Sequence, residues 1–173
     1  MCIRDRSKID TYVSLIYSNN LLNYGYWHQQ LLAESIGKNG IDLTPIISEC
    51  PKDHHSIMQL FLDGKRNKFF TFFKITDKKI DNSIKDHFNQ KFRRNSLNNI
   101  INAQFNATIS VFKKNLIPFR VILIDQKKST QDLISLLVYS MMETAILCKA
   151  FDLNPFNQPA VEAIKKETYS ILS

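Results

Sequence analysis

Two pairs of polar residues have the types and the spacing to do chemistry. In the first pair, Gln30 and Glu34 lie four residues apart in the stretch HQQLLAES, so they share one face of a helix. Leu31, Leu32 and Ala33 stand beside Glu34, and partial removal of water there would make its carboxylate a stronger base. The sequence leaves two interpretations of this pair open: Glu34 is the base of a functional site, or Gln30 and Glu34 are a solvated pair on the surface.

The second pair is Gln158 and Lys165, in the C-terminal stretch NPFNQPAVEAIKK. Seven residues make about two helical turns, so the two side chains return to nearly the same side of a helix. An amide and an ammonium group would then face either a site or the solvent. Glu162, between them, has no evident task and is interpreted as structural.

A third candidate is the histidine pair in CPKDHHS. A metal site would need several of Cys50, Asp53, His54 and His55 to converge, but adjacent helical residues point about 100° apart. No CxxC or HExxH spacing supports such a site, so no metal is expected. One functional imidazole at the first turn of a helix is the better interpretation, because the helix dipole there favours the neutral ring.

Strands and helices that would position these residues alternate along the chain. β-Branched and aromatic runs predict strands over 12–17, 68–75 and 119–124. Apolar spacing predicts helices over 19–36, 53–62, 96–114 and 130–150, and one more from Pro159. The stretch 37–53 is expected to be a loop, and the apolar helix 130–150 to be buried on most sides. This order predicts α/β layers around a mainly parallel sheet.

For the helix at 96–114, the apolar spacing predicts which residues are buried. In the helix at 96–114 the stripe is expected to contain Leu97, Ile101, Phe105, Thr108 and Phe112.

Composition limits the classes of partner. The 173 residues are 44% hydrophobic, which is enough for the core of one domain. The net charge of +7 is dispersed, and the basic stretch 91–99 carries no recognised nucleic-acid motif, so no nucleic-acid partner is expected. Three scattered cysteines predict a reducing cytoplasm. Without a secretory signal or an apolar run of membrane-spanning length, no membrane association is expected.

The first residues differ from the rest. MCIRDRS (Met1–Ser7) is a polar leader of the kind that sequencing-adapter remnants leave at the ends of reading frames. We expect it to be artefactual, so that one domain extends over 8–173 and the native protein is truncated before it.

Three stretches together resemble one family: QQLLAESIGKNGIDLTPI, PKDHHSIMQLFLDG and DLNPFNQPAVEAIKK are similar to the C-terminal part of bacterial glucose-6-phosphate isomerase. NAQFNATISVF and FRVILI resemble its later helix and strand, so the similarity covers about 12–173. Asn157 stands where the family's C-terminal pattern has Asp, and we expect a weaker turn contact there rather than lost chemistry. The resemblance implies a three-layer αβα sandwich of the SIS (sugar isomerase) type.

The resemblance also implies a role for each candidate residue. Glu34 would be the catalytic base, moving a proton between C1 and C2 of the sugar through a cis-enediol. Gln30 and Gln158 would line the sugar-phosphate site. His55 would open the sugar ring, with Lys165 stabilising negative charge on oxygen. That route requires no metal and no organic cofactor.

Other family features are expected outside this sequence. A Ser/Thr-rich phosphate-gripping loop and a Gly-Gly-Arg signature of the family's earlier half do not occur here. In the family two SIS domains pack together, two chains form a homodimer, and the active-site histidine comes from the neighbouring subunit. We therefore expect the isolated chain to be inactive, although it would belong to a cytoplasmic enzyme of glycolysis and gluconeogenesis. The alternative is a non-catalytic SIS module that binds sugar phosphates and acts through a partner.

Overall fold

A computed structural model describes residues 9–41, 43–76 and 96–173. The expected leader Met1–Ser7 lies outside the described residues, as does most of the basic stretch 91–99. The helices and strands named below all lie within the described ranges.

The fold is built on a sheet of four strands: β1 (Thr11–Ile16), β2 (Thr44–Glu49), β3 (Lys68–Thr76) and β4 (Phe119–Asp125). Their order is β2-β1-β3-β4, and all three pairings are parallel. In the register of this sheet, Phe72 of β3 lies beside Leu15 of β1 and Val121 of β4. The predicted mainly parallel sheet is confirmed.

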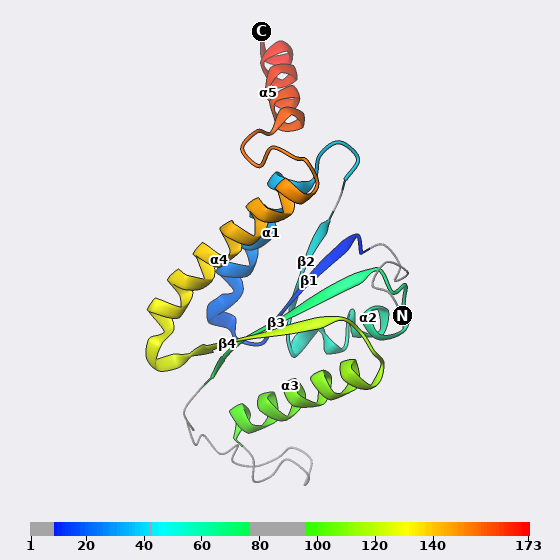
Figure 1. Ribbon diagram of the computed structural model, residues 1–173, viewed down its shortest axis with the longest axis vertical. Coiled ribbons are helices and arrows are strands. Elements are labelled where there is room, and N and C mark those ends of the chain that lie inside the picture. Colours follow the sequence, from blue (N-terminus) through cyan, green and yellow to red (C-terminus); the bar gives the residue numbers. More distant parts are fainter. Residues whose placement is uncertain (1–8, 42, 77–95) are drawn as a thin grey trace.

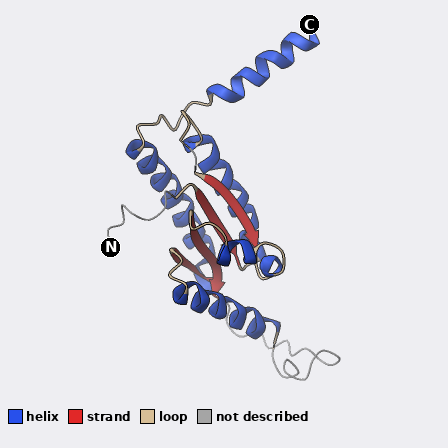
Figure 2. Cartoon of the chain, turned by 90° about the vertical axis from the view of Figure 1, so that its right-hand side faces the viewer, coloured by secondary structure: helices blue, strands red, loops and turns tan. Residues whose placement is uncertain are grey.

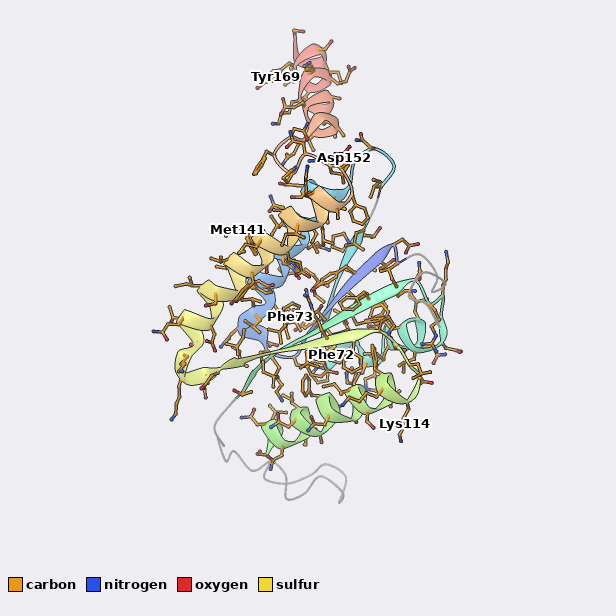
Figure 3. All side chains as sticks on the ribbon, in the orientation of Figure 1. Phe72, Phe73, Lys114, Met141, Asp152 and Tyr169 are labelled. Carbon is orange, nitrogen blue, oxygen red and sulfur yellow. The ribbon has the colours of Figure 1, made fainter. Side chains whose placement is uncertain are left out.

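Helices cover the two faces of the sheet. One face carries α1 (Leu22–Ile36) and α4 (Ser129–Ala150), and the other carries α2 (Met58–Asp63) and α3 (Leu97–Lys114) (Figures 1 and 2). Successive residues of a strand point to opposite faces, so the Phe-rich strand β3 supplies both cores. Figure 3 shows Phe72 and Phe73 at the centre of the molecule between the layers. The predicted three-layer αβα arrangement is confirmed.

The core on the α3 side is aromatic. The ring of Phe72 packs edge-on against Phe105 and Phe112, with centroids 6.0 and 5.2 Å apart, and Phe70 packs against Phe112 at 4.9 Å. Helix α3 begins where the sequence predicts, because the hydroxyl of Ser96 accepts a hydrogen bond from the Asn99 amide at 3.2 Å.

The expected stripe of α3 is wrong at one position. Phe105, Thr108 and Phe112 are buried and Ile101 packs against the same core, but Leu97 is 56% exposed. The buried stripe thus starts one turn into the helix.

Two predicted elements in the first half of the chain need correction. The stretch 37–53 is not all loop, because it contains β2. This strand lies at the edge of the sheet, where Pro45 is tolerated, and only two of its six residues, Ile46 and Ile47, belong to the β-branched or aromatic apolar types that mark the other strands. The helix expected over 53–62 is divided into a 3-10 turn, η3 (Lys52–His54), and α2. The Asp53 carboxylate accepts a hydrogen bond from the Glu49 amide at 2.7 Å, which ties η3 back to β2.

The prediction that the apolar helix at 130–150 is buried on most sides is wrong. Helix α4 buries one narrow stripe, Leu136, Ser140, Thr144 and Cys148. Its other faces are exposed and largely apolar, with Ile134, Tyr139, Met142 and Ile146 between 54% and 69% exposed. Periodicity could not reveal this, because a helix that is apolar all round has the same pattern whether or not something covers it.

One described segment, Gln126–Ala150, is long and apolar enough to cross a membrane by length and composition alone. The expectation that no apolar run reaches that length is therefore wrong. In the fold this segment contains α4, whose buried stripe lies against α1.

The last helix, α5 (Pro159–Leu172), begins at the predicted proline. It extends away from the rest of the molecule in both views (Figures 1 and 2). From Ala160 to Leu172 every side chain of α5 is exposed, and Figure 3 shows Tyr169 on this outlying helix. A turn at 151–158 connects it to α4.

Candidate functional site

The carboxylate of Glu34 is held by two glutamines. Gln30 donates from Nε2 to Oε1 of Glu34 at 2.8 Å, and Gln158 donates from Nε2 to Oε2 at 2.6 Å. Each carboxylate oxygen thus receives an amide donor, which fixes the direction of the carboxylate. The structure brings together three of the five residues singled out from the sequence.

Helix α1 presents this carboxylate because its opposite side is anchored. Leu32 and Ile36 are buried against Tyr12 and Cys148. On the remaining side, Gln30 is exposed and Glu34, near the C-terminal end of the helix, is half-buried. Burial of the flanking leucine and isoleucine therefore fixes where the carboxylate points.

Helix α1 ends at Gly37, whose amide donates to the Ala33 carbonyl at 3.2 Å. A side chain at this position would place its Cβ 2.8 Å from the same oxygen, which is too close. Glycine is thus required for the tight turn that returns the chain past Glu34.

A hollow of about 390 Å³ opens at this turn. Its walls come from the end of α1, the turn after it and the start of α5: Ala33, Glu34, Gly37, Lys38, Asn39, Gln158, Ala160 and Val161. A positioned carboxylate in a hollow of this size can accept a proton from a bound small molecule.

Lys38 is a functional candidate that the sequence analysis missed. It lines the same hollow as Glu34, and its Nζ donates to the carbonyl of Asn154 at 2.6 Å and to Oδ1 of Asn157 at 3.2 Å. The sequence did hold an indication of this role, because Lys38 directly follows the turn glycine Gly37 in the stretch QQLLAESIGKNG. Asn157, the residue that departs from the family pattern, therefore contacts Lys38 from the turn 151–158 that precedes α5.

Lys165 is not among the residues that line the hollow. It lies on the outlying helix α5 and forms an ion pair with Glu162, with Nζ and Oε1 2.6 Å apart. Both side chains of this pair are more than half exposed. In this chain, therefore, the structure does not bring Lys165 to Glu34.

The two histidines follow β2. His54 belongs to η3, and its Nε2 lies 2.7 Å from the hydroxyl of Tyr17. Burial, together with the neighbouring charge of His55, lowers the pKa of His54 below its usual range. His55 ends η3 and is exposed.

The sheet separates Glu34 from the histidines. Helix α1 returns the chain from the carboxyl end of β1 to the amino end of β2, so Glu34 lies at the amino end of the sheet. The histidines follow the carboxyl end of β2 and therefore lie at the opposite end of the sheet. Within a single chain these groups cannot act on the same small molecule.

Metal chemistry has no donor set in the described part of the chain. In residues 9–41, 43–76 and 96–173, no group of three or more His, Cys, Asp or Glu side chains is placed to hold a metal ion.

Comparison with solved structures gives the class of fold. A crystal structure of a hypothetical protein from Thermus thermophilus matches with a TM-score of 0.85 and 24% sequence identity. The match covers 95% of this chain and 42% of that protein. The chain thus has a three-layer α/β fold that also occurs within a larger protein.

Comparison with curated proteins gives the family, although no family model matches the sequence. Glucose-6-phosphate isomerase of Methanocaldococcus jannaschii is 31% identical over 169 residues, which cover 97% of this chain and 42% of that protein. The same enzyme of Campylobacter jejuni is 32% identical, over 99% and 44%. The probable glucose-6-phosphate isomerase of Methanococcus maripaludis is 33% identical, over 93% and 36%.

The chain belongs to the glucose-6-phosphate isomerase family, as the resemblance in the sequence implied. It spans 36% to 44% of the length of these curated relatives.

Proposed function

We propose that this chain carries the base of a glucose-6-phosphate isomerase, which interconverts glucose 6-phosphate and fructose 6-phosphate. The observation that supports this most directly is the Glu34 carboxylate, held by Gln30 and Gln158 beside a hollow of about 390 Å³. The second support is the family, whose members are aldose–ketose isomerases.

The chemistry needs one base with a fixed direction. Glu34 takes the proton from C2 of the open-chain aldose while the aldehyde oxygen O1 gains a proton, which leaves a cis-enediol. The carboxyl group then returns its proton to C1 as the O2 hydroxyl loses its proton, which gives the ketose. Because the donor and the acceptor carbon are neighbours, one carboxylate can serve both steps. The two amides keep the carboxylate aimed while it gains and loses the proton.

Ring opening would use His55 and Lys165. An imidazole can protonate the ring oxygen and accept the proton of the C1 hydroxyl, while an ammonium group stabilises negative charge on oxygen. In the proposed enzyme the His55 that serves a given Glu34 comes from the neighbouring subunit of a homodimer. Glu34 and His55 of one chain lie at opposite ends of the sheet, which supports that arrangement.

The remaining parts of the site would come from the part of the relatives that this chain does not match. We propose that a Ser/Thr-rich loop and a Gly-Gly-Arg segment there bind the phosphate, in a second SIS domain that packs on this one. The complete enzyme would be cytoplasmic and would serve glycolysis and gluconeogenesis without a cofactor. The 173-residue chain alone is then inactive in a coupled assay with fructose 6-phosphate; turnover near that of an intact family enzyme would contradict this.

The decisive experiment replaces the base in a chain completed with the missing half. Glu34→Gln preserves the shape of the side chain but removes its basicity, and kcat should fall by about 10²- to 10⁴-fold. Glu162→Gln is the matched control, because Glu162 is an exposed carboxylate outside the hollow. Full isomerisation by Glu34→Gln would refute the assignment of the base.

The alternative is a non-catalytic SIS module that binds sugar phosphates and acts through a partner. It is favoured by one observation, that His55 and Lys165 lie away from Glu34 within the chain. The same experiment separates the two functions. A completed chain that binds fructose 6-phosphate without turnover, whether position 34 is Glu or Gln, would be a sensor.

A further inference from the structure

We propose that Lys38 is a positioning residue, which holds Gln158 against the carboxylate of Glu34. It acts on the turn at 151–158, which carries Gln158, rather than on a bound molecule. The geometric part of this inference concerns the chain alone. Its catalytic part rests on the proposed function, in which Glu34 is the base.

The turn that carries Gln158 is packed only where it starts. Leu153 is 8% exposed, and its amide donates to the Cys148 carbonyl at 2.8 Å. Over residues 154–158 the side chains are exposed, apart from the half-buried Pro155, and α5 then extends away from the molecule (Figure 1). Core packing therefore fixes the beginning of the turn but not the residue that reaches Glu34.

Lys38 joins the exposed part of this turn to the domain. Its Nζ donates to the Asn154 carbonyl at 2.6 Å and to Oδ1 of Asn157 at 3.2 Å, so one ammonium group connects two acceptors of the turn. Gln158 is the next residue, and its Nε2 donates to Oε2 of Glu34 at 2.6 Å. The other hydrogen bonds that the described chain makes with residues 154–158 stay within the turn and α5.

The backbone of Lys38 is fixed independently of that turn. Lys38 and Ile41 exchange two backbone hydrogen bonds, at 3.1 and 2.9 Å, across Asn39 and Gly40. These two residues have φ values of 54° and 71°, as in the tightest chain reversals. Ile41 packs against the same buried cluster as Ile36 of α1. Lys38 thus starts from a fixed point beside α1 and can hold the turn 151–158 against it.

The two amides on the carboxylate therefore depend on different parts of the chain. Gln30 lies four residues before Glu34 on α1, so the helix itself sets their contact. Gln158 is 124 residues away from Glu34 in sequence and reaches it only when the turn is in place. Loss of the Lys38 contacts should release Gln158, leave Gln30 bound and aim the carboxylate less well.

The first test is NMR of the ¹⁵N-labelled 173-residue chain, read at the side-chain amides. Lys38→Met keeps an unbranched side chain but removes the donors, so the signals of the Gln158 amide should move to their positions in Glu34→Ala. Those of Gln30 should stay where they are in the parent chain. Unchanged Gln158 signals, or equal movement of Gln30 and Gln158, would overturn the proposal.

Two further variants complete the NMR test. Lys149→Met is the matched control, because Lys149 is exposed in the last turn of α4, and it should leave both amides unchanged. Asn157→Ala removes one acceptor of Lys38 at an exposed position, so it tests the contact even where Lys38→Met does not fold. It should move the Gln158 signals in the same direction as Lys38→Met. No movement in Asn157→Ala, or an equal one in Lys149→Met, would count against the role of Lys38.

The second test is kinetic and uses the chain completed with the missing half. Lys38→Met should lower kcat about tenfold when residue 158 is Gln. In the Gln158→Ala background it should lower kcat less than about twofold, because Lys38 then has no amide to position. Equal losses in the two backgrounds would refute an action through Gln158.

The two tests separate the positioning role from the proposed function. If the completed chain has no isomerase activity, or if Glu34→Gln retains all of it, the proposed function fails and the NMR result still decides the contact. If Lys38→Met leaves the Gln158 amide in place, the positioning role fails whatever the activity.

Discussion

The two faces of the sheet are covered in different ways. On the α3 face, aromatic rings from β3 and α3 interlock, and Phe70, Phe72 and Phe112 are at most 1% exposed. On the α4 face, the helix buries the stripe Leu136, Ser140, Thr144 and Cys148, and several of its bulky apolar side chains, among them Ile134, Met142 and Ile146, point outward. The large apolar side chains of α3 thus pack mostly in the core of this chain, whereas many of those of α4 are exposed.

The α4 face also holds a network of polar side chains beside its aromatic rings. Arg120 of β4 makes two hydrogen bonds to the Glu143 carboxylate, at 2.7 and 2.8 Å, and one to Thr71 at 2.9 Å. Tyr12 joins them through its hydroxyl, which donates to Thr71 at 2.8 Å. The pair Arg120 and Glu143 lines a surface hollow of about 700 Å³ between β4 and α4. One face of the sheet is thus filled by interlocking aromatic rings, whereas the other combines a buried polar network with an exposed apolar helix surface.

The largest expected effect comes from emptying the aromatic core. Phe112→Ala should lower the free energy of unfolding by about 3–5 kcal/mol, because it removes buried ring contacts and leaves a cavity. Ile146→Ala, at a 65% exposed position of α4, should change it by less than about 0.5 kcal/mol. Urea unfolding of the two variants measures both values, and similar losses would mean that the two faces do not differ.

Acid should affect the α4 face through His28. This side chain is 2% exposed, and its Nδ1 has no hydrogen-bond partner among the described residues. Burial lowers the pKa of His28 from 6.5 to about 4. The unfolded chain thus binds the proton more readily, and stability is lost as the pH falls from about 6.5 toward 4, by up to ~1.4 kcal/mol per pH unit.

The groups around His28 limit what else could cause such a slope. Tyr12, Tyr24 and Phe73 pack against its ring, and the charges of Glu143 and Arg120 act on it in opposite directions. The measurement is urea unfolding from pH 7 to pH 4 for the parent chain and for His28→Leu. The parent should lose stability more steeply, and parallel curves would contradict the assignment to His28.

A smaller loss is expected from the ion pair on the same face. Glu143→Gln keeps the size of the side chain but leaves Arg120 without its counter-charge, so stability should fall by about 1–2 kcal/mol. Glu162→Gln breaks an exposed pair on α5 and should cost less than about 0.5 kcal/mol. Chemical unfolding at neutral pH compares them; equal values would show that the Arg120 network adds nothing beyond a surface pair.

The smallest expected effect lies in the turn after α4. Asn157→Asp would place a carboxylate where the amide oxygen now accepts from Lys38, and the exposed ion pair should add about 0.2–1 kcal/mol. The gain should disappear at high salt, because exposed charges are screened. Loss of stability would show that the neutral amide is the better partner in this turn.

Local patterns predicted most elements of the fold. Strand β3 was recognisable by its dense run of aromatic residues, and α3 by its apolar stripe, which is correct except at Leu97. Strand β2 was missed because an edge strand can carry proline, and only two of its six residues are β-branched apolar residues. The surroundings of α4 could not be predicted, because the sequence of a helix does not say what packs against it.

The contacts of the candidate site were also predictable only where they are local in the sequence. Gln30 and Glu34 are helical neighbours, so spacing predicted their contact. Gln158 is 124 residues from Glu34, and no spacing rule reaches that far; only the family resemblance placed them together. Lys38 was overlooked because its approach depends on the turn at Gly37. The separation of His55 from Glu34 follows from the parallel topology, which a linear motif does not contain.

That separation has a genetic consequence. If each site of the dimer combines Glu34 of one chain with His55 of the other, two defective alleles of the gene can complement each other. Co-expression of completed chains carrying Glu34→Gln and His55→Ala would yield mixed dimers with one intact site and one doubly defective site. With random pairing about one quarter of all sites would be intact, whereas each version alone would have no intact site.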